Sequence, residues 1–358
     1  MRIAIDAREL HGKPTGVGRF LRELLAVWAT MPDAQAHEFV PLAPEGSGSA
    51  GGTLWEQMVL PAQARDAGAD VLFAPAYSGP ILPPMPMVLA IHDVSYAAHP
   101  EWFAWREGAR RRTSVQLAAR AAARIITISH FSKREIVAHL GIEDSKIAVV
   151  YPGLTPFNRD VSPDRRPVTK RQAVLFVGSV FNRRHVPELI EGFARLARSN
   201  PDVRLDIVGE NRTSPHVKVD SLVRATGVGD RIHLRSYVPD DELRKLYAAS
   251  SAFAFLSEYE GFGLTPLEAL AAGLPVLLLD TAVAREVCAD AARYVPRADP
   301  ALVEDGLRAL LFDAAERERI LDAGTRVLAR YSWTDCAARV LRVLVEAAAL
   351  GPKGAAQR

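Results

Sequence analysis

Short runs of apolar residues alternate with longer amphipathic segments along almost the whole chain, and this rhythm limits the possible folds more than any other feature. Continuous apolar runs such as VLFA, at residues 71–74, are typical of strands that are buried on both faces. Helical patterns between such strands indicate the crossover connections that parallel strands require. The sequence therefore predicts an α/β protein with parallel sheets covered on both sides.

The alternation occurs in two halves of the chain. In the first half we predict strands at residues 2–6, 38–42, 71–74, 87–92, 124–129 and 147–151, and helices at 17–30, 104–123 and 132–140. In the second half we predict strands at residues 173–177, 204–208, 232–235, 252–256, 275–279 and 293–295, and helices at 186–199, 217–226, 241–249 and 266–272. A last helix is predicted near residues 334–349.

The two halves are separated by residues 151–172, a segment rich in proline and charge that carries no periodicity and is interpreted as a linker. A chain of 358 residues exceeds the usual size of one core, so two domains are expected. We predict a Rossmann-like domain at residues 1–165, a second at 166–332, and a terminal helix at 333–358 that packs back on the first domain. Because open α/β sheets bind ligands beyond the carboxyl ends of their strands, candidate site residues are sought in the loops that follow strands.

Composition excludes several classes of protein. The net charge of +2 gives no overall reason to expect nucleic-acid binding. The two cysteines, Cys288 and Cys336, make a disulfide framework improbable and fit a reducing compartment. The amino terminus becomes polar too early for a signal peptide, and no apolar run approaches the roughly 20 residues that span a bilayer. We expect a cytoplasmic protein, and contact with the inner face of a membrane stays open.

Two glutamates flank a glycine loop in the stretch EGFGLTPLE, Glu260 to Glu268. One interpretation is structural: Thr265 is the N-cap of a helix, and Glu268, three residues later, completes a capping box. It leaves Gly261 and Gly263 unexplained, which free the backbone to approach a ligand closely. A helix start after such a loop suits phosphate. The two carboxylates could then hold sugar hydroxyls on either side of a diphosphate, which is the layout of a sugar nucleotide.

A second loop, VGSVFNRRH, follows the strand at residues 173–177 and leads into a helix. Ser179 lies at its start, and Arg183 and Arg184 form a basic pair. Arginine holds phosphate through two parallel hydrogen bonds, so the pair suits a diphosphate. A solvated basic turn is the alternative.

Two loops of the first half carry further candidates. Gly16, Gly18 and Arg19, in TGVGR, can bring backbone and charge to an anionic group, although an ordinary tight turn is equally possible. The third glycine of the dinucleotide fingerprint is missing, which makes a nicotinamide cofactor a weak interpretation. His92 and Asp93 end the strand at 87–92, where His92 can carry a proton or bind a sugar. The alternative for His92 is a structural hydrogen bond to the backbone.

A basic helical segment contains Arg106 and Arg110 to Arg112, preceded by Trp102 and Trp105. It can contact anionic lipid or a lipid-linked diphosphate. A solvated helix face is the preferred interpretation. Walker A, zinc-spacing and G-x-S-x-G patterns are all absent from the sequence.

Together these segments resemble the retaining glycosyltransferases of family 4, which have the GT-B fold of two Rossmann-like domains facing across a cleft. The stretch with Glu260 and Glu268 resembles their E-x7-E motif. Similarity extends to TGVGRFLREL, HDVSYAAHPEWF, ITISHFSKREI, VGSVFNRRHVPELIEGFARL and YVPDDELRKLYAAS, and the mannosyltransferase-like branch is the most similar.

The resemblance implies roles for individual residues. Glu268 would hold the ribose, and Glu260 would face the transferred sugar. Arg183 and Arg184 would bind the diphosphate, and His92 would lie near the reacting centre. The other implied donor contacts are Gly16, Gly18, Ser179, Val238, Gly261, Phe262, Gly263, Leu264 and Thr265, with Asp93 and Arg19 on the acceptor side.

Two positions depart from the family pattern. Arg184 stands where the family usually has lysine, and His185 where asparagine is common. No metal or other cofactor is implied, because such enzymes use the nucleotide sugar itself as donor.

The resemblance implies transfer of a hexose to a glycan or lipid-linked saccharide, with mannose from GDP-mannose favoured over glucose from UDP-glucose. A sugar-nucleotide epimerase or hydrolase on the same fold is an alternative, as is a non-catalytic protein that binds glycans or nucleotides.

Overall fold

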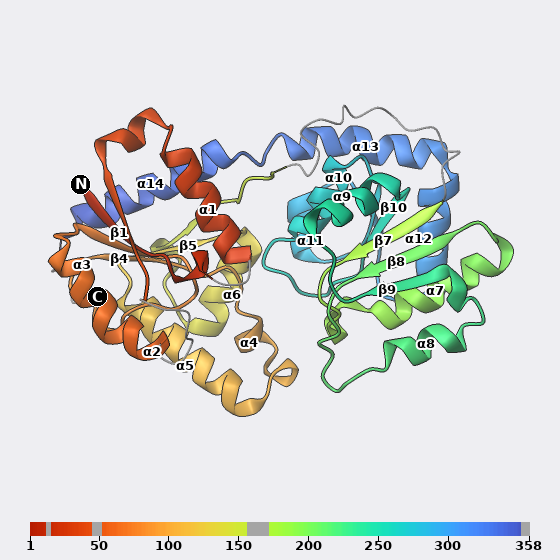
Figure 1. Ribbon diagram of the computed structural model, residues 1–358, viewed down its shortest axis with the longest axis horizontal. Helices are drawn as coiled ribbons and strands as arrows, with labels where there is room; N and C mark the ends of the chain where they lie inside the picture. Colours follow the sequence, from red (N-terminus) through yellow and green to blue (C-terminus); the bar gives the residue numbers. More distant parts are fainter. Residues whose placement is uncertain (12–15, 45–51, 156–171, 352–358) are drawn as a thin grey trace. The chain divides into compact units, whose positions relative to one another are not determined.

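The computed structural model describes residues 1–11, 16–44, 52–155 and 172–351, and these divide into two compact units. Unit 1 comprises Met1–Gly153 together with the segment from Tyr331 onward, and unit 2 comprises Leu154–Arg330. The linker predicted at residues 151–172 falls largely outside the described residues. Figure 1 shows a sheet with helices against it in each unit.

Unit 1 is built on a parallel six-stranded sheet with the strand order β2-β1-β3-β4-β5-β6. Its strands are β1(Arg2–Asp6), β2(Glu38–Leu42), β3(Val71–Ala74), β4(Met87–Ala90), β5(Arg124–Thr127) and β6(Ile147–Val149). Its helices are α1(Gly16–Trp28), α2(Gly52–Leu54), α3(Leu60–Asp66), α4(Ser95–Ala98), α5(Trp105–Ala121), α6(His130–Leu140) and α14(Trp333–Ala349), with the shorter segments η1(Arg8–Leu10), η2(Pro32–Ala36), η4(Trp55–Val59), η5(Pro100–Trp102) and η6(Asp144–Lys146).

Unit 2 repeats the architecture, with the strand order β12-β11-β10-β7-β8-β9, all parallel. Its strands are β7(Ala173–Val177), β8(Arg204–Val208), β9(Ile232–Arg235), β10(Ala252–Phe255), β11(Val276–Leu279) and β12(Arg293–Val295). Its helices are α7(Val186–Ser199), α8(Val219–Ala225), α9(Asp240–Ala249), α10(Leu264–Ala271), α11(Ala282–Cys288), α12(Pro300–Phe312) and α13(Ala314–Leu328), with the short η7(Asn182–Arg184) and η8(Gly229–Arg231).

The core of unit 1 explains why the buried positions of its strands are mostly apolar. Successive residues of a strand point to opposite faces of the sheet, and each face has its own helical cover. Ile3 and Ile5 of β1 join the cluster under α1 and α14, whereas Ala4 between them joins the cluster on the other face. A strand covered on both faces therefore has apolar residues at consecutive buried positions, and this makes the strands recognisable in the sequence.

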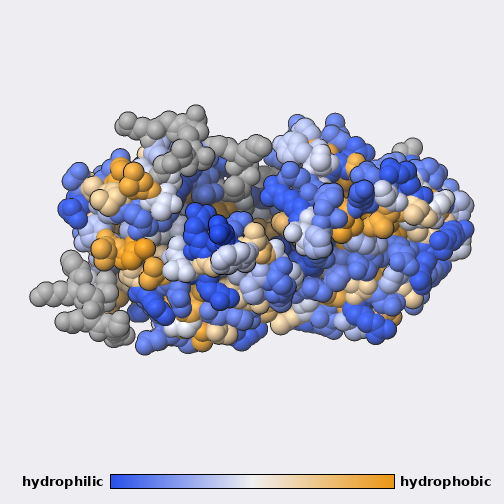
Figure 2. All heavy atoms as spheres, turned by 90° about the horizontal axis from the view of Figure 1, so that it is seen from below, coloured by the Kyte–Doolittle hydropathy of each residue, from blue (hydrophilic) through white to orange (hydrophobic). Residues whose placement is uncertain are grey.

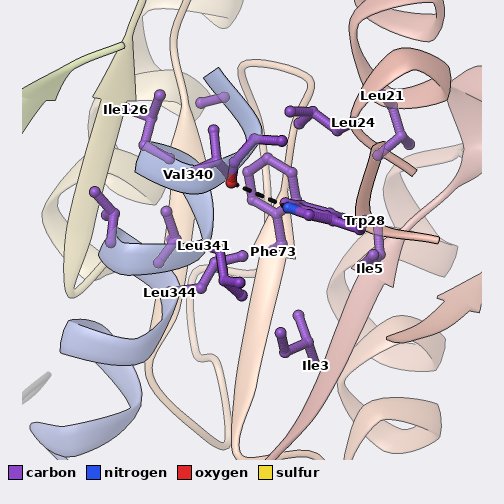
Figure 3. Packing of buried hydrophobic residues seen from close by; sticks show 14 of the residues in the cluster. Ile3, Ile5, Leu21, Leu24, Trp28, Phe73, Ile126, Val340, Leu341 and Leu344 are labelled. Atoms are coloured by element: carbon purple, nitrogen blue, oxygen red, sulfur yellow. Dashed lines mark hydrogen bonds between the residues drawn. The ribbon is translucent and has the colours of Figure 1, made fainter. Parts of the chain in front are cut away.

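The last helix, α14, is part of the core of unit 1 although it ends the chain. Figure 3 shows its apolar side chains against Trp28 and Phe73, and the indole Nε1–H of Trp28 donates to the carbonyl of Ala337 at 3.0 Å. At the entry to this helix, a Cβ on Gly153 would lie 2.3 Å from the backbone nitrogen of Trp333. Only glycine allows the two segments to come this close.

The structure confirms the α/β class and the predicted strands, with corrections at their ends. The strands predicted to end at residues 92, 129, 151 and 256 end earlier, at Ala90, Thr127, Val149 and Phe255. Apolar residues continue past each strand, but their backbone leaves the sheet to form the loops that carry polar groups. The prediction also missed helices, of which the longest are α12 and α13.

The surface agrees with a chain of ordinary hydropathy. Figure 2 shows apolar residues in small separate groups among hydrophilic ones on the face it presents. None of the helices within the described ranges is long and apolar enough to cross a bilayer.

Candidate functional site

Two loops of unit 2 meet because their strands are neighbours. β7 and β10 pair in parallel, so the loops that follow them leave the same edge of the sheet. The first contains Gly178, Ser179 and the turn η7 with Arg183 and Arg184, which we call the arginine turn. The backbone N–H of Glu258, in the second loop, donates to the carbonyl of Arg183 at 2.9 Å. Residues 75 positions apart along the chain are thus joined directly.

Arg184 is the centre of this junction. Its Nε and Nη2 lie 2.8 and 2.7 Å from Oε1 of Glu260, and its Nη1 donates to the carbonyl of Ser179 at 2.9 Å. The guanidinium lies 4.9 Å from the ring centroid of Phe255. Arg184 and Glu260 are 13% and 19% exposed, so the ion pair is largely screened from water. The structure therefore holds a cation in a fixed orientation at the carboxyl end of β7.

Glu260 is held from a second side. The hydroxyl of the buried Ser257 donates to the same Oε1 at 2.8 Å. Its other oxygen, Oε2, accepts no hydrogen bond from the described residues. The carboxylate is thus positioned through one oxygen and can accept a hydrogen bond through the other.

Arg183, the other half of the basic pair, lies over an aromatic ring. Its guanidinium carbon is 4.3 Å from the ring centroid of Phe181. Stacking of this kind orients the planar guanidinium and favours its charged form.

The residue after the pair, His185, has a left-handed backbone with φ of +50° and forms the N-cap of α7. Its Nε2 lies 2.7 Å from Oε1 of Glu258, and its Nδ1 lies 3.4 Å from Oε1 of Glu188. The hydrogen bond to Glu188, followed by the bond to Glu258, raises the pKa of His185 above its ordinary value although burial opposes this. A protonated His185 ties the arginine turn to the loop of Glu258.

The second loop leads into α10, and here the predicted capping box is wrong. The helix begins at Leu264, Gly263 is its N-cap with φ of +101°, and no side chain caps it. Thr265 and Pro266 therefore lie inside the first turn. Glycine adopts the left-handed conformation easily, and it has no side chain that would cover the start of the helix. The first backbone N–H groups of α10 are therefore not blocked by a capping side chain. Gly261 lies in this loop, as does Phe262, which is buried.

Glu268 lies on α10 and is 6% exposed. Val238, one of the implied donor contacts, follows β9 and is also buried, at 7% exposed, whereas its neighbour Tyr237 is 80% exposed.

A small cavity lies behind the glycine loop. Its volume is about 20 Å³, close to the space of one water molecule. Its walls include Phe255, Glu260, Gly263, Thr281 and Cys288. The cavity lies between the glycine loop and α11. Because its lining is mostly apolar and its volume is small, it is not a candidate binding site for a polar ligand.

In unit 1, His92 follows β4 and is 8% exposed. Its Nε2 lies 2.9 Å from the carbonyl of Pro75. Since a carbonyl can only accept, Nε2 carries the proton. Burial lowers the pKa of His92 despite this hydrogen bond, so the ring is neutral and its Nδ1 is an acceptor. The backbone bond proposed as the structural alternative for His92 is therefore present.

Asp93 is fixed by its neighbours. Its Oδ2 accepts from the hydroxyl of Tyr77 at 3.0 Å, and its Oδ1 accepts from the backbone and hydroxyl of Ser95 at 2.9 and 2.8 Å. The ring of Tyr77 meets the ring of His92 edge-on at 5.3 Å. Tyr77 has φ of +64°, which is unusual for a non-glycine residue and typical of functional sites.

Gly16 and Gly18 begin α1, with Gly18 buried and Arg19 half-buried beside it. The preceding residues 12–15 of the predicted glycine loop lie outside the described residues. Phe20 of this helix packs edge-on against His92 at 5.3 Å between ring centroids. The start of α1 and the end of β4 therefore lie close together, as the prediction of a shared site requires.

Sequence reasoning missed Ser257 and Tyr77. Ser257 stands one residue after an apolar strand end, which is the signal that could have marked it. The left-handed backbone of Tyr77 has no signature in the sequence. A metal centre is not supported within the described ranges, where no group of three or more potential ligands comes together.

Comparison with known proteins connects both units to one family. The model "Glycosyl transferases group 1" matches residues 158–327, and the model "Glycosyltransferase Family 4" matches residues 16–156. The chain belongs to the family 4 glycosyltransferases. The matches cover unit 2, with the arginine turn and Glu260, as well as the part of unit 1 that holds His92.

Curated relatives include several mannosyltransferases. The chain is 26% identical over 262 residues to an O-antigen chain mannosyltransferase B of Escherichia coli, covering 71% of this chain and 68% of that protein. It is 28% identical over 280 residues to an MMP alpha-(1->4)-mannosyltransferase of Mycolicibacterium hassiacum, covering 74% and 66%. A phosphatidyl-myo-inositol mannosyltransferase of Mycobacterium tuberculosis is 31% identical over 242 residues, covering 64% and 61%. The matched part thus spans about two thirds of these relatives.

Solved structures show the same fold. The Anabaena protein HepE in complex with UDP and glucose superposes with a TM-score of 0.72 at 18% identity, covering 97% of this chain and all of that one. WaaG, a glycosyltransferase involved in lipopolysaccharide biosynthesis, gives a TM-score of 0.68 at 20% identity, covering 96% and 99%. Two Rossmann-like units with these neighbours confirm the predicted GT-B fold.

Proposed function

We propose that this family 4 enzyme moves a hexose from a nucleotide sugar to a glycan or lipid-linked saccharide with retention of configuration. Mannose from GDP-mannose is the donor we favour, because mannosyltransferases recur among the curated relatives. We further propose that the reaction takes place in the cytoplasm, because the low cysteine content fits a reducing compartment.

The observation that carries the proposal is the arrangement at the carboxyl ends of β7 and β10. Arg184 is oriented by Glu260, Ser179 and Phe255, and a glycine N-cap opens the start of α10. Arginine and free helical N–H groups are both ligands for phosphate oxygens. A polar carboxylate oxygen within the same loop supplies an acceptor for a sugar hydroxyl. These are the groups that a sugar diphosphate needs.

The arginines would act mainly on the leaving group. As the bond from the sugar to the diphosphate breaks, negative charge grows on the phosphate oxygens, and donors already in place stabilise it without reorganisation. The contacts of Arg184 with Glu260 and Ser179 use one N–H on each of its three nitrogens, so each terminal nitrogen keeps a second N–H for a phosphate oxygen. In this mechanism arginine stabilises the negative charge on the leaving diphosphate, and the reaction needs no bound metal.

Glu260 would bind the transferred sugar through Oε2 while Oε1 stays with Arg184 and Ser257. Glu268 would hold the ribose. His92, neutral with Nδ1 as an acceptor, would bind a hydroxyl near the reacting centre and would not act as a cation. Retention requires the acceptor hydroxyl to arrive on the face from which the diphosphate leaves.

A screen of nucleotide sugars for thermal stabilisation tests the proposal, because a ligand that binds only the folded state raises the melting temperature. GDP-mannose should stabilise the enzyme more than GDP, UDP-glucose or mannose. The stabilising donor is then incubated with candidate acceptors, and the anomeric configuration of the product is read by NMR. A donor converted equally well without any acceptor would indicate a hydrolase or epimerase, and an inverted product would rule out retention.

A further inference from the structure

Arg111, on α5 of unit 1, is held between two tyrosine rings. Its guanidinium carbon lies 5.5 Å from the ring centroid of Tyr77 and 5.1 Å from that of Tyr96. The residue is half-buried, and its guanidinium makes no hydrogen bond or ion pair with any residue of the described ranges. Two ring contacts therefore fix the orientation of a cation whose N–H donors stay available.

Other arginines near this edge of the sheet are occupied. Arg8, after β1, contacts the buried carboxylates of Asp6 and Glu56. Arg112, next to Arg111 on α5, donates to the carbonyl of Ala97 at 3.0 Å. The hydrogen bonds and ion pairs of Arg8 and Arg112 give these residues a structural role. The ring contacts of Arg111 orient its guanidinium but use none of its N–H donors.

No neighbouring carboxylate forms an ion pair with Arg111 within the described ranges. Both oxygens of Asp93 are engaged by Tyr77 and Ser95. Burial, together with the nearby Asp93, raises the pKa of the hydroxyls of Tyr77 and Tyr96, so neither becomes a phenolate at neutral pH. The hydroxyl of Tyr96 is buried and has no hydrogen-bond partner among the described residues, so it can donate to a group that binds beside Arg111.

The cluster lies beside the predicted site residues. Tyr77 contacts His92 through its ring and Asp93 through its hydroxyl, so a single side chain separates Arg111 from both. α5 also carries Arg106 and Arg110, but both are exposed and belong to its solvated face, whereas Arg111 is half-buried beside the site residues.

We propose that Arg111 binds a phosphate group of the acceptor, close to the hydroxyl that receives the sugar. The inference rests on the proposed function, since it assigns a chemical class to the acceptor of that reaction. The planar fork of the guanidinium matches two oxygens of a phosphate, and the two rings hold it in place before the acceptor arrives. The phosphate belongs either to a soluble sugar phosphate or to a lipid-linked one.

Calorimetric titration separates this site from the donor site. A nucleoside diphosphate is first added to saturation, which occupies the arginine turn of unit 2. Mannose 1-phosphate, mannose and inorganic phosphate are then titrated in turn. In a parallel experiment the enzyme is sedimented with phosphatidylcholine vesicles that contain or lack a polyprenyl phosphate. The enzymes compared are the wild type, R111Q, R111K and R110Q, where R110Q removes an equal charge from the exposed neighbour on α5.

We expect R111Q to lower the affinity for the phosphate probe about tenfold or more, and R111K to lower it less. R110Q should change this affinity by less than about twofold. Mannose without phosphate should bind equally to all four proteins. Dependence on Arg111 for soluble probes identifies a sugar phosphate, and dependence for polyprenyl phosphate vesicles alone identifies a lipid-linked acceptor.

Equal losses in R111Q and R110Q, or no dependence on Arg111 for any probe, would overturn the assignment. R111K retains the charge next to the two rings, so it keeps the comparison valid if R111Q unfolds. Failure of the nucleoside diphosphate to bind would count against the proposed function instead, since Arg111 has no part in that step.

Discussion

Replacing Arg184 by methionine should destabilise unit 2, and the structure sets the size of the effect. The substitution keeps much of the volume but removes two contacts, at 2.8 and 2.7 Å, between the guanidinium and Oε1 of Glu260. Exposed ion pairs contribute about 0–1 kcal/mol, whereas loss of one partner from a buried pair costs about 3–5 kcal/mol. Because Arg184 and Glu260 are only 13% and 19% exposed, we expect a loss of about 2–3 kcal/mol in the free energy of unfolding.

The loss should depend on Glu260. In E260Q the partner carries no charge, so adding R184M should cost less than it does in the wild type. A double-mutant cycle should give a coupling free energy of about 1–2 kcal/mol between the two positions. The matched control is R195M, whose partner Glu191 lies 3.4 Å away on the same helix with both side chains well exposed, and which should cost no more than about 0.5 kcal/mol.

Two optical signals locate the effect. All five tryptophans belong to unit 1, at positions 28, 55, 102, 105 and 333. Urea unfolding followed by tryptophan fluorescence thus reports unit 1, and far-ultraviolet circular dichroism reports both units. R184M should shift the dichroism transition and leave the fluorescence transition in place. If R184M costs no more than R195M, or if the two losses of the cycle simply add, the ion pair does not organise the site.

Three further predictions concern backbone packing, pH and thiol reactivity. G209A should destabilise unit 2 by about 3 kcal/mol or more, since its Cβ would lie 1.9 Å from the carbonyl oxygen of Gly178; an unchanged dichroism melt would contradict this. The pKa of His185 is raised in the folded state, so its protonation stabilises the fold. This contribution is complete below about pH 6.5, the ordinary pKa of histidine, and is lost as the pH rises through the higher pKa of the folded state. The difference in free energy of unfolding between wild type and H185Q should accordingly shrink between about pH 6 and about pH 8.5. A constant difference would count against the contacts with Glu188 and Glu258. Both cysteines are buried with the pKa raised to about 12, so a thiol reagent at about pH 8 should modify them only after unfolding, and rapid reaction of the native protein would refute their burial.

The strands were predictable because both faces of each sheet are covered. β1 must be apolar on both sides, and its bounds, Arg2–Asp6, could be read from the sequence without error. The ends of strands that continue as apolar loops could not be predicted, as at His92, where β4 already ends at Ala90. The hydrophobicity of a residue indicates that it is buried but not whether its backbone is hydrogen-bonded in the sheet. The missed helices α12 and α13 contain regular helical patterns, and the prediction did not assign them.

The candidate site was predictable in its parts but not in its connections. The glycine loop and basic pair could be found from residue types in loops after strands. The pair of Arg184 with Glu260 depends on β7 and β10 being neighbours, which no local pattern encodes. The capping box failed because a left-handed Gly263 took the N-cap position, and the positive φ of Tyr77 is set by its tertiary contacts.

The most direct test of the account is the affinity of a nucleoside diphosphate for the wild type and for the double variant R183A/R184A. If the arginine turn meets the diphosphate, the variant should lose about 100-fold or more in affinity, while the weak binding of the unphosphorylated nucleoside stays the same. Equal affinities of both proteins for the diphosphate, with the variant folded, would contradict the central claim.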